Sequence, residues 1–172
     1  MHTDDDIPNA FAPPDNSAHP ATIAARLMQL PEHAHLAEHD VSFGWLVRGV
    51  QKEKGGRVEL GSVHVVKTMF QGQFKDLCLQ MLERMLGYLP DYLVVLDAQW
   101  WAQASPIDRE ALVYHELSHV KQAVDRYGAP RFDREGNPVF ELVRHDVEAF
   151  NAEVRRYGAW KSDISGFLEA AR

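Results

Sequence analysis

The sequence His115-Glu116-Leu117-Ser118-His119 constrains this chain more than any other feature, because its chemistry requires a helix. On a helix, residues i and i+4 share one face and lie about 6 Å apart, so His115 and His119 can bind the same zinc ion. Glu116 can then face a zinc-activated water and act as the general base. The motif therefore predicts a metal site with His115 and His119 as ligands and Glu116 as the catalytic residue.

The residues around this motif predict the helix that it needs. Ser105 is a favourable N-cap and Pro106 a favourable first helical residue. Gly128 and Pro130 are typical of residues just beyond a helix end. The apolar residues at helical spacing between these limits are Ile107, Leu112, Val113, Leu117, Val120 and Val124. We therefore expect one helix from about residue 106 to residue 126, with both histidines in its middle.

A catalytic zinc site takes three protein ligands and keeps a fourth position for water. The candidates for the third ligand are His145, Asp146 and Glu148, at the start of a further helix expected over about 146–157. His145 and Glu148 are one helical turn apart, so either could reach the metal, whereas Asp146 points about 100° away from His145. We expect His145, because a neutral imidazole suits zinc, and keep Glu148 as the alternative. Candidate donors to an oxyanion are Tyr157, Arg144 and Tyr127.

Composition excludes several classes of protein. The 172 residues are 45% hydrophobic and 25% charged, as in ordinary soluble globular proteins. The net charge of −7 argues against general binding to nucleic acid or to anionic membranes. The single cysteine, Cys78, excludes an internal disulfide and fits a reducing compartment. With neither a signal peptide nor an apolar run of about 20 residues in the sequence, we expect a cytoplasmic protein.

The order of sequence signals predicts an N-terminal arm followed by one domain. Residues 1–19 are acidic and rich in proline, so we expect a flexible arm, and residues 20–172 are expected to form a single domain. The helices expected besides the motif helix cover about 20–30, 73–86, 146–157 and part of the tail from 158. The strands expected cover about 41–50, 57–69 and 92–96, and a hairpin or long loop is expected over 131–140.

The motif and its neighbours also resemble a known group of enzymes. The strand at 92–96, Trp100 and the stretch from Ser105 to His119 are similar to those of zincin metallopeptidases. With His-Asp-Val-Glu-Ala-Phe from His145 and Arg-Tyr-Gly from Arg156, the chain most resembles the putative phage metallopeptidase family, over about 41–160. This likeness implies a phage or prophage origin.

The arrangement is also similar to that of SprT-like proteases, whose third ligand is a histidine at the start of a helix. This chain departs from their pattern, because Asp146 stands where they have glycine and Phe150 comes one residue late. The sequence contains no paired-cysteine zinc ribbon, so we do not expect a role on DNA–protein crosslinks.

Together these features predict an α+β, zincin-like minimal metallopeptidase domain with a small, mainly antiparallel sheet packed on the helix of the motif. An edge strand, either 92–96 or within 57–69, would pair with an extended substrate. The expected function is zinc-dependent hydrolysis of peptide bonds in a peptide or protein, with neither nucleic acid nor membrane as a partner. The alternative is a non-catalytic, zinc-stabilised binding or regulatory module. The sequence leaves the oligomeric state open.

Overall fold

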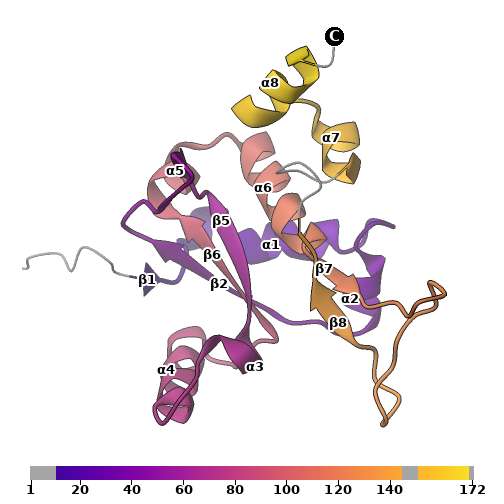
Figure 1. Ribbon diagram of the computed structural model, residues 1–172. Helices are drawn as coiled ribbons and strands as arrows, with labels where there is room; N and C mark the ends of the chain where they lie inside the picture. Colours follow the sequence, from indigo (N-terminus) through magenta and orange to yellow (C-terminus); the bar gives the residue numbers. More distant parts are fainter. Residues whose placement is uncertain (1–10, 145–150, 171–172) are drawn as a thin grey trace, which may run out of the picture. The chain divides into compact units, whose positions relative to one another are not determined.

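The structure, a computed structural model, describes residues 11–144 and 151–170. It has the α+β composition expected from the sequence (Figure 1). Its contacts divide the chain into two compact units, Met1–Thr22 with Ser42–Ser105 and Ile23–Val41 with Pro106–Arg172. The single domain expected over 20–172 stays a prediction. Within the described ranges, no helix is long and apolar enough to cross a membrane.

A four-stranded sheet organises the first unit, with β2, β6 and β5 side by side (Figure 1). Its order is β1 (Phe11–Ala12), β2 (Phe43–Arg48), β6 (Tyr92–Asp97) and β5 (Gly61–Val65). The β1–β2 and β5–β6 pairs are antiparallel, and the β2–β6 pair is parallel. The sheet is thus mainly antiparallel, as expected. Because Phe11 and Ala12 pair with β2, part of the expected flexible arm is a strand.

The apolar run at 92–96 forms the interior strand β6, whose six residues are all buried. Both of its backbone edges are paired, one with β2 and one with β5. The expectation that 92–96 could be an edge strand for substrate is therefore wrong. A run without polar alternation is typical of a strand covered on both faces. Among the described strands of this sheet, β5 lies at the end of the order on the other side from β1.

Helix α4 (Lys75–Leu86) covers part of this sheet in the first unit. Its inward side chains, Leu79, Leu82 and Leu86, pack on a core that includes Leu46 and Leu93. The helix ends at Gly87, whose φ of 83° is favourable only for glycine. The other short elements of the unit are η1 (Asn16–Ala18), β3 (Glu53–Lys54), β4 (Arg57–Val58), α3 (Val66–Met69) and α5 (Ala98–Gln103).

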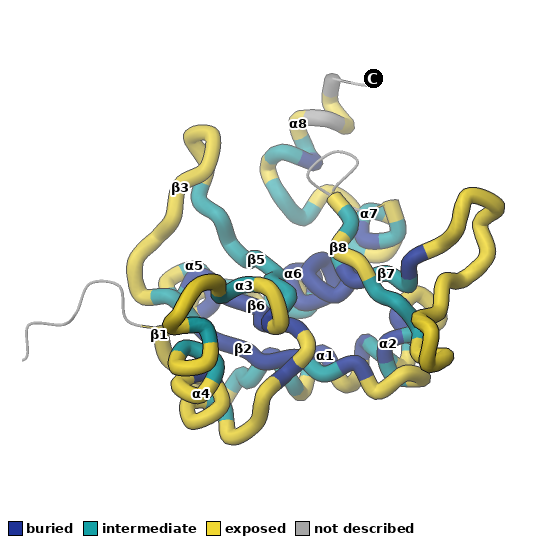
Figure 2. Tube along the Cα trace, turned by 60° about the horizontal axis from the view of Figure 1, so that its bottom comes forward, coloured by how far each residue is buried: buried dark blue, intermediate teal, exposed yellow. Residues whose placement is uncertain are grey.

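The second unit is built around α6 (Pro106–Ser118), the helix that carries most of the motif. Every residue from 111 to 118 is buried, and Figure 2 shows this part of α6 in the colour of buried residues. Helix α6 contacts α7 (Asn151–Tyr157) and β7 (Val120–Gln122), and β7 also contacts α2 (Ala34–Glu38). The unit also contains β8 (Phe140–Leu142) and α8 (Ser162–Ala170), while α1 (Pro20–Leu27) begins in the first unit and ends in the second.

The motif helix is shorter than the sequence predicts, because α6 ends at Ser118 and not near residue 126. Strand β7 begins two residues later and pairs antiparallel with β8, from Val120 opposite Leu142 to Gln122 opposite Phe140. The Ser118 hydroxyl donates to the Tyr114 carbonyl over 2.7 Å, a bond that competes with helix continuation. Pairing with Leu142 thus overrides the helical spacing of Val120, and Val124 forms a bridge with Pro130.

Two turns of the same sequence pattern, Asp-Arg-x-Gly-x-Pro, connect β7 to β8. In each turn the aspartate Oδ1 accepts the backbone N–H groups of the second and fourth residues that follow, for Asp125 over 2.8 and 3.0 Å and for Asp133 over 2.8 and 2.9 Å. Gly128 and Gly136 occupy equivalent left-handed positions. Of the two forms expected for 131–140, a hairpin or a long loop, the bridge between Phe132 and Pro138 shows the hairpin. Gly128 therefore ends a turn and not the motif helix.

Candidate functional site

The two histidines of the motif lie together at the end of α6. Their ring centroids are 5.0 Å apart and the ring planes make an angle of 81°. His115 lies in the last turn of α6, and His119 is the first residue after the helix. The His119 N–H donates to the Glu116 carbonyl over 3.2 Å, so the helical path continues through one tighter turn. The i, i+4 relationship is therefore kept although the helix is shorter than expected.

A buried carboxylate holds the ring of His115. Its Nδ1 lies 2.5 Å from Oε2 of Glu153, a residue of α7 with no exposed surface. The other carboxylate oxygen, Oε1, accepts the indole N–H of Trp160 over 2.5 Å. Because an ionised carboxylate can only accept, His115 donates through Nδ1 and carries its lone pair on Nε2 when neutral. Carboxylates orient metal-binding histidines in this way.

A backbone carbonyl holds the ring of His119 in the same sense. Its Nδ1 lies 2.8 Å from the carbonyl oxygen of Val143, which follows β8 directly. A carbonyl can only accept, so His119 also donates through Nδ1 and carries its lone pair on Nε2 when neutral. Both rings are thus fixed in the tautomer that presents Nε2 to a metal. Two neutral imidazole nitrogens are donors that zinc accepts well, so these two residues fit the expected metal.

Glu116 is buried between the two histidines in the sequence, with 2% of its surface exposed. It lies on the last turn of α6, one residue after His115. Its role as the general base stays a prediction.

Glu110, which precedes the motif on α6, links this helix to α7 and α1. Its Oε1 accepts the Tyr157 hydroxyl over 2.8 Å, and its Oε2 lies 2.5 Å from Nη2 of Arg26. Burial raises the pKa of Glu110, but the hydrogen bonds from Tyr157 and Arg26 outweigh burial, and the net pKa is lowered. The Tyr157 ring also packs edge-on against Tyr114 on α6, with centroids 5.5 Å apart. These contacts fix α7, and with it Glu153, against α6.

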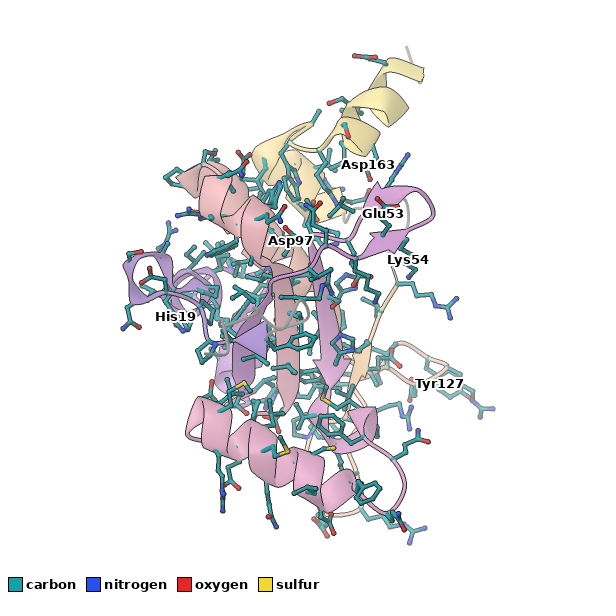
Figure 3. All side chains as sticks on the ribbon, turned by 90° about the vertical axis from the view of Figure 1, so that its left-hand side faces the viewer. His19, Glu53, Lys54, Asp97, Tyr127 and Asp163 are labelled. Carbon is teal, nitrogen blue, oxygen red and sulfur yellow. The ribbon has the colours of Figure 1, made fainter. Side chains whose placement is uncertain are left out.

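The three candidate oxyanion donors have other surroundings. Tyr157 gives its hydroxyl proton to Glu110, and burial raises its pKa. Tyr127 lies at the exposed tip of the first Asp-Arg-x-Gly-x-Pro turn (Figure 3), and Arg144 is exposed. None of the three is placed beside the histidine pair by a contact in the described part of the chain.

The candidates for the third ligand, His145, Asp146 and Glu148, lie outside the described residues. Within the described ranges, no group of three or more His, Cys, Asp or Glu side chains is arranged to hold a metal. The structure therefore brings together two of the expected ligands, His115 and His119, and leaves the choice of the third to experiment.

Sequence reasoning missed three residues that position the histidines, namely Glu153, Trp160 and Val143. Glu153 had a detectable signal, because it lies four residues before Tyr157 on the face that the apolar spacing marks as inward. An acidic residue on a buried face needs a partner, and His115 is that partner. Val143 acts through its backbone, so its side chain carries no signal.

Comparison with known proteins gives one match. A family model described as putative phage metallopeptidase matches residues 16–172, nearly the whole chain. No curated protein and no solved structure matches the sequence. The family description names metallopeptidases, which implies hydrolysis of peptide bonds with a metal cofactor. The chain therefore belongs to the putative phage metallopeptidase family.

Proposed function

We propose that this chain is a zinc-dependent metallopeptidase in which His115 and His119 bind the metal through Nε2 and Glu116 is the general base. The substrate is a peptide or protein, and the second unit is the core of a zincin-like arrangement. The proposal narrows the family's general description to one metal, one base and one pair of ligands.

The tautomers of the two histidines carry this proposal. Each Nδ1 lies within hydrogen-bond distance of a group that can only accept, Glu153 for one ring and Val143 for the other. Both lone pairs are then assigned to Nε2, on rings whose centroids are 5.0 Å apart. If the two histidines had only a structural role, nothing would require both rings to have the same tautomer. Two Nε2 lone pairs from one helix turn suit a single tetrahedral ion.

The protein's own groups have distinct roles in the proposed reaction. A zinc ion held there supplies Lewis acidity to a water molecule and to the scissile carbonyl. Glu116 removes a proton from the water and delivers it to the leaving amine. Glu153 and the Val143 carbonyl keep the two imidazoles oriented, and Glu153 also makes His115 a more basic ligand.

His145 remains our choice for the third ligand, with Glu148 as the alternative. Val143 is hydrogen bonded to His119, and His145 follows it by two residues in the sequence. Two residues span at most about 7 Å, so the chain cannot carry His145 far from this contact. Glu148 is five residues before Glu153, which is bonded to His115, so chain length permits it as well.

The Glu116→Gln variant tests the proposal, because it preserves the shape of the side chain and removes the proton acceptor. We expect zinc content by elemental analysis to stay at one ion per chain, while hydrolysis of an unfolded protein substrate falls about 10²–10⁴-fold. Glu141→Gln is the matched control, since Glu141 is an exposed carboxylate on β8 in the same unit. It should leave both quantities unchanged.

Three outcomes contradict parts of the proposal. Unchanged hydrolysis in Glu116→Gln would exclude Glu116 as the base. A wild-type protein that binds zinc and cleaves none of a broad set of peptides would favour the zinc-stabilised binding or regulatory module. If the protein takes up no zinc, even after reconstitution, the metal site is excluded.

A further inference from the structure

Helix α4 carries an exposed apolar stripe on the side that does not pack on the sheet. The stripe consists of Phe74, the residue just before the helix, and of Leu77, Met81 and Met85 on the helix, which are between 42% and 61% exposed. Leu79, Leu82 and Leu86 already supply the packing face of the same helix. In Figure 2, the tube over α4 is largely in the colour of exposed residues. A continuous exposed row of large apolar side chains is typical of an interaction surface.

The stripe is symmetric about Met81. Leu77 and Met85 lie four residues on either side of it. Two copies of α4 packed antiparallel with a two-fold axis at Met81 therefore place Leu77 opposite Met85. A two-fold interface needs this property, because each residue i that meets residue j must also be met by j from the other copy.

The polar row beside the stripe is complementary to itself in the same arrangement. Asp76, Gln80 and Arg84 are exposed and follow each other at four-residue spacing. When the row is reversed by the two-fold axis, Asp76 comes opposite the partner's Arg84, offset by about 3 Å along the helix. Gln80 comes near the partner's Gln80. The ends of the row thus attract in the antiparallel pair, whereas a parallel pair would place like charges together.

The charge of the surface favours a second copy over a membrane. Side chains of this kind have roughly 150–250 Å² each, so the four that are about half exposed present on the order of 400 Å². Two copies would bury about 800 Å², an area typical of weak and transient interfaces. Helices that bind membranes carry mainly Lys and Arg on their polar face. By contrast, α4 has two basic residues, Lys75 and Arg84, and two acidic ones, Asp76 and Glu83.

We propose that the chain forms a two-fold symmetric homodimer through the α4 stripe, with Met81 on the axis. The interface residues belong to the first unit and the proposed active-site residues to the second, so the proposal does not depend on the peptidase function. We expect a weak dimer that exchanges with monomer, because interfaces of such small area are mostly transient.

Sedimentation equilibrium of the full chain over about 1–500 μM measures the association. Met81→Glu places two carboxylates face to face on the axis, and we expect the dissociation constant to rise at least about tenfold. Glu83→Gln is the control, because Glu83 is exposed on α4 about 200° around the helix from Met81. It should leave the dissociation constant unchanged. Circular dichroism and the midpoint of thermal unfolding at low concentration confirm that each variant is folded.

A charge reversal tests the register of the helices. Asp76→Arg and Arg84→Asp should each raise the dissociation constant about two- to fivefold, because each puts like charges opposite one another. The double variant should return it to near the wild-type value. A wild-type protein that stays monomeric at 500 μM would overturn the proposal, as would a dimer unaffected by Met81→Glu. Binding of the monomer to lipid vesicles through the stripe would assign the surface to a membrane instead.

Discussion

His119 and Val143 are joined by two hydrogen bonds of opposite sense. The Val143 N–H donates to the His119 carbonyl over 2.8 Å, and the His119 Nδ1–H donates to the Val143 carbonyl over the same distance. The first bond continues the ladder between β7 and β8 by one more pair. The hairpin that begins and ends at these two residues therefore fixes the ring of His119 through backbone alone. The ring of His115, by contrast, is held by a side chain, that of Glu153.

This difference predicts that Glu153, and not Val143, is sensitive to substitution. Glu153→Ala removes the acceptor that orients His115, so we expect zinc affinity to fall about 10–100-fold. Glu153→Gln keeps an acceptor oxygen without the charge and should fall between Glu153→Ala and the wild type. Val143→Ala leaves its carbonyl in place and should keep near wild-type affinity. Zinc titration against a competing chelator measures all three.

Substitution of Glu153 also leaves the Trp160 indole without its acceptor, and Trp160→Phe separates that effect. Trp160→Phe removes the same hydrogen bond from the other side and leaves Glu153 on His115. If it lowers zinc affinity as much as Glu153→Ala, the loss comes from loosening of α7 and not from the orientation of His115.

The sequence predicted that His115 and His119 lie side by side, as the structure shows, but it misplaced the end of their helix. Both results have one physical origin. The i, i+4 spacing of His115 and His119 is local, so it survives in the last turn of α6. The end of the helix depends on β8, which lies 20 residues downstream and pairs with β7. Leu117, Val120 and Val124 have helical spacing, but in the structure Leu117 is in α6, Val120 is in β7 and Val124 follows β7. Local periodicity cannot detect a pairing partner so far along the chain.

The sheet shows the same division between local and distant information. The buried run at 92–96 was recognisable as a strand, because it is apolar, short and bounded by proline and aspartate. Its place between β2 and β5 was not recognisable, since strand order is set by connections over tens of residues. Glu153 was overlooked for a related reason. Its partner, His115, is 38 residues away.

Gly44 should be intolerant of even one added carbon. A Cβ at Gly44 in β2 would lie 2.6 Å from Cδ1 of Leu86 and 2.7 Å from Cγ of Pro90. Both atoms belong to the packed side of the first unit, so Gly44→Ala should lower the free energy of unfolding by about 1–3 kcal/mol. Gly166 in α8 has open space around it, and Gly166→Ala should raise that free energy by about 0.5–1 kcal/mol. Urea denaturation of the two variants measures the contrast.

His33 should make the protein less stable in mild acid. Its ring is fully buried, packs edge-on against Tyr114 with centroids 4.4 Å apart, and has no hydrogen-bond partner on either nitrogen in the described part of the chain. Burial, followed by the positive charge of Lys121, lowers its pKa from 6.5 to about 3. His33 therefore takes up a proton near pH 6.5 in the unfolded chain, but only near pH 3 in the folded chain.

The free energy of unfolding should consequently fall as the pH decreases through this window, by roughly 5 kcal/mol at most. His33→Leu removes the titrating group while keeping an apolar side chain of similar size, so its stability should depend less steeply on pH between 6.5 and 4. At pH 7, where His33 is neutral in both states, the substitution should be close to neutral. If the free energy of unfolding depends equally on pH in the wild type and in His33→Leu, the folded protein protonates His33 as readily as the unfolded chain does.

The third ligand decides which kind of zinc site this protein has. If His145 binds the metal, His145→Ala should lower zinc affinity by orders of magnitude, because one of three ligands is lost. Glu148→Ala should then lower it only about 10–100-fold, the range for a group that orients a ligand. Asp146→Ala is the matched control, since Asp146 points about 100° away from His145 on the expected helix. Competition with a chelator ranks the three variants. Near wild-type affinity in His145→Ala, together with a large loss in Glu148→Ala, would instead assign a site of two histidines and one glutamate, in which the segment before α7 supplies a carboxylate and not an imidazole.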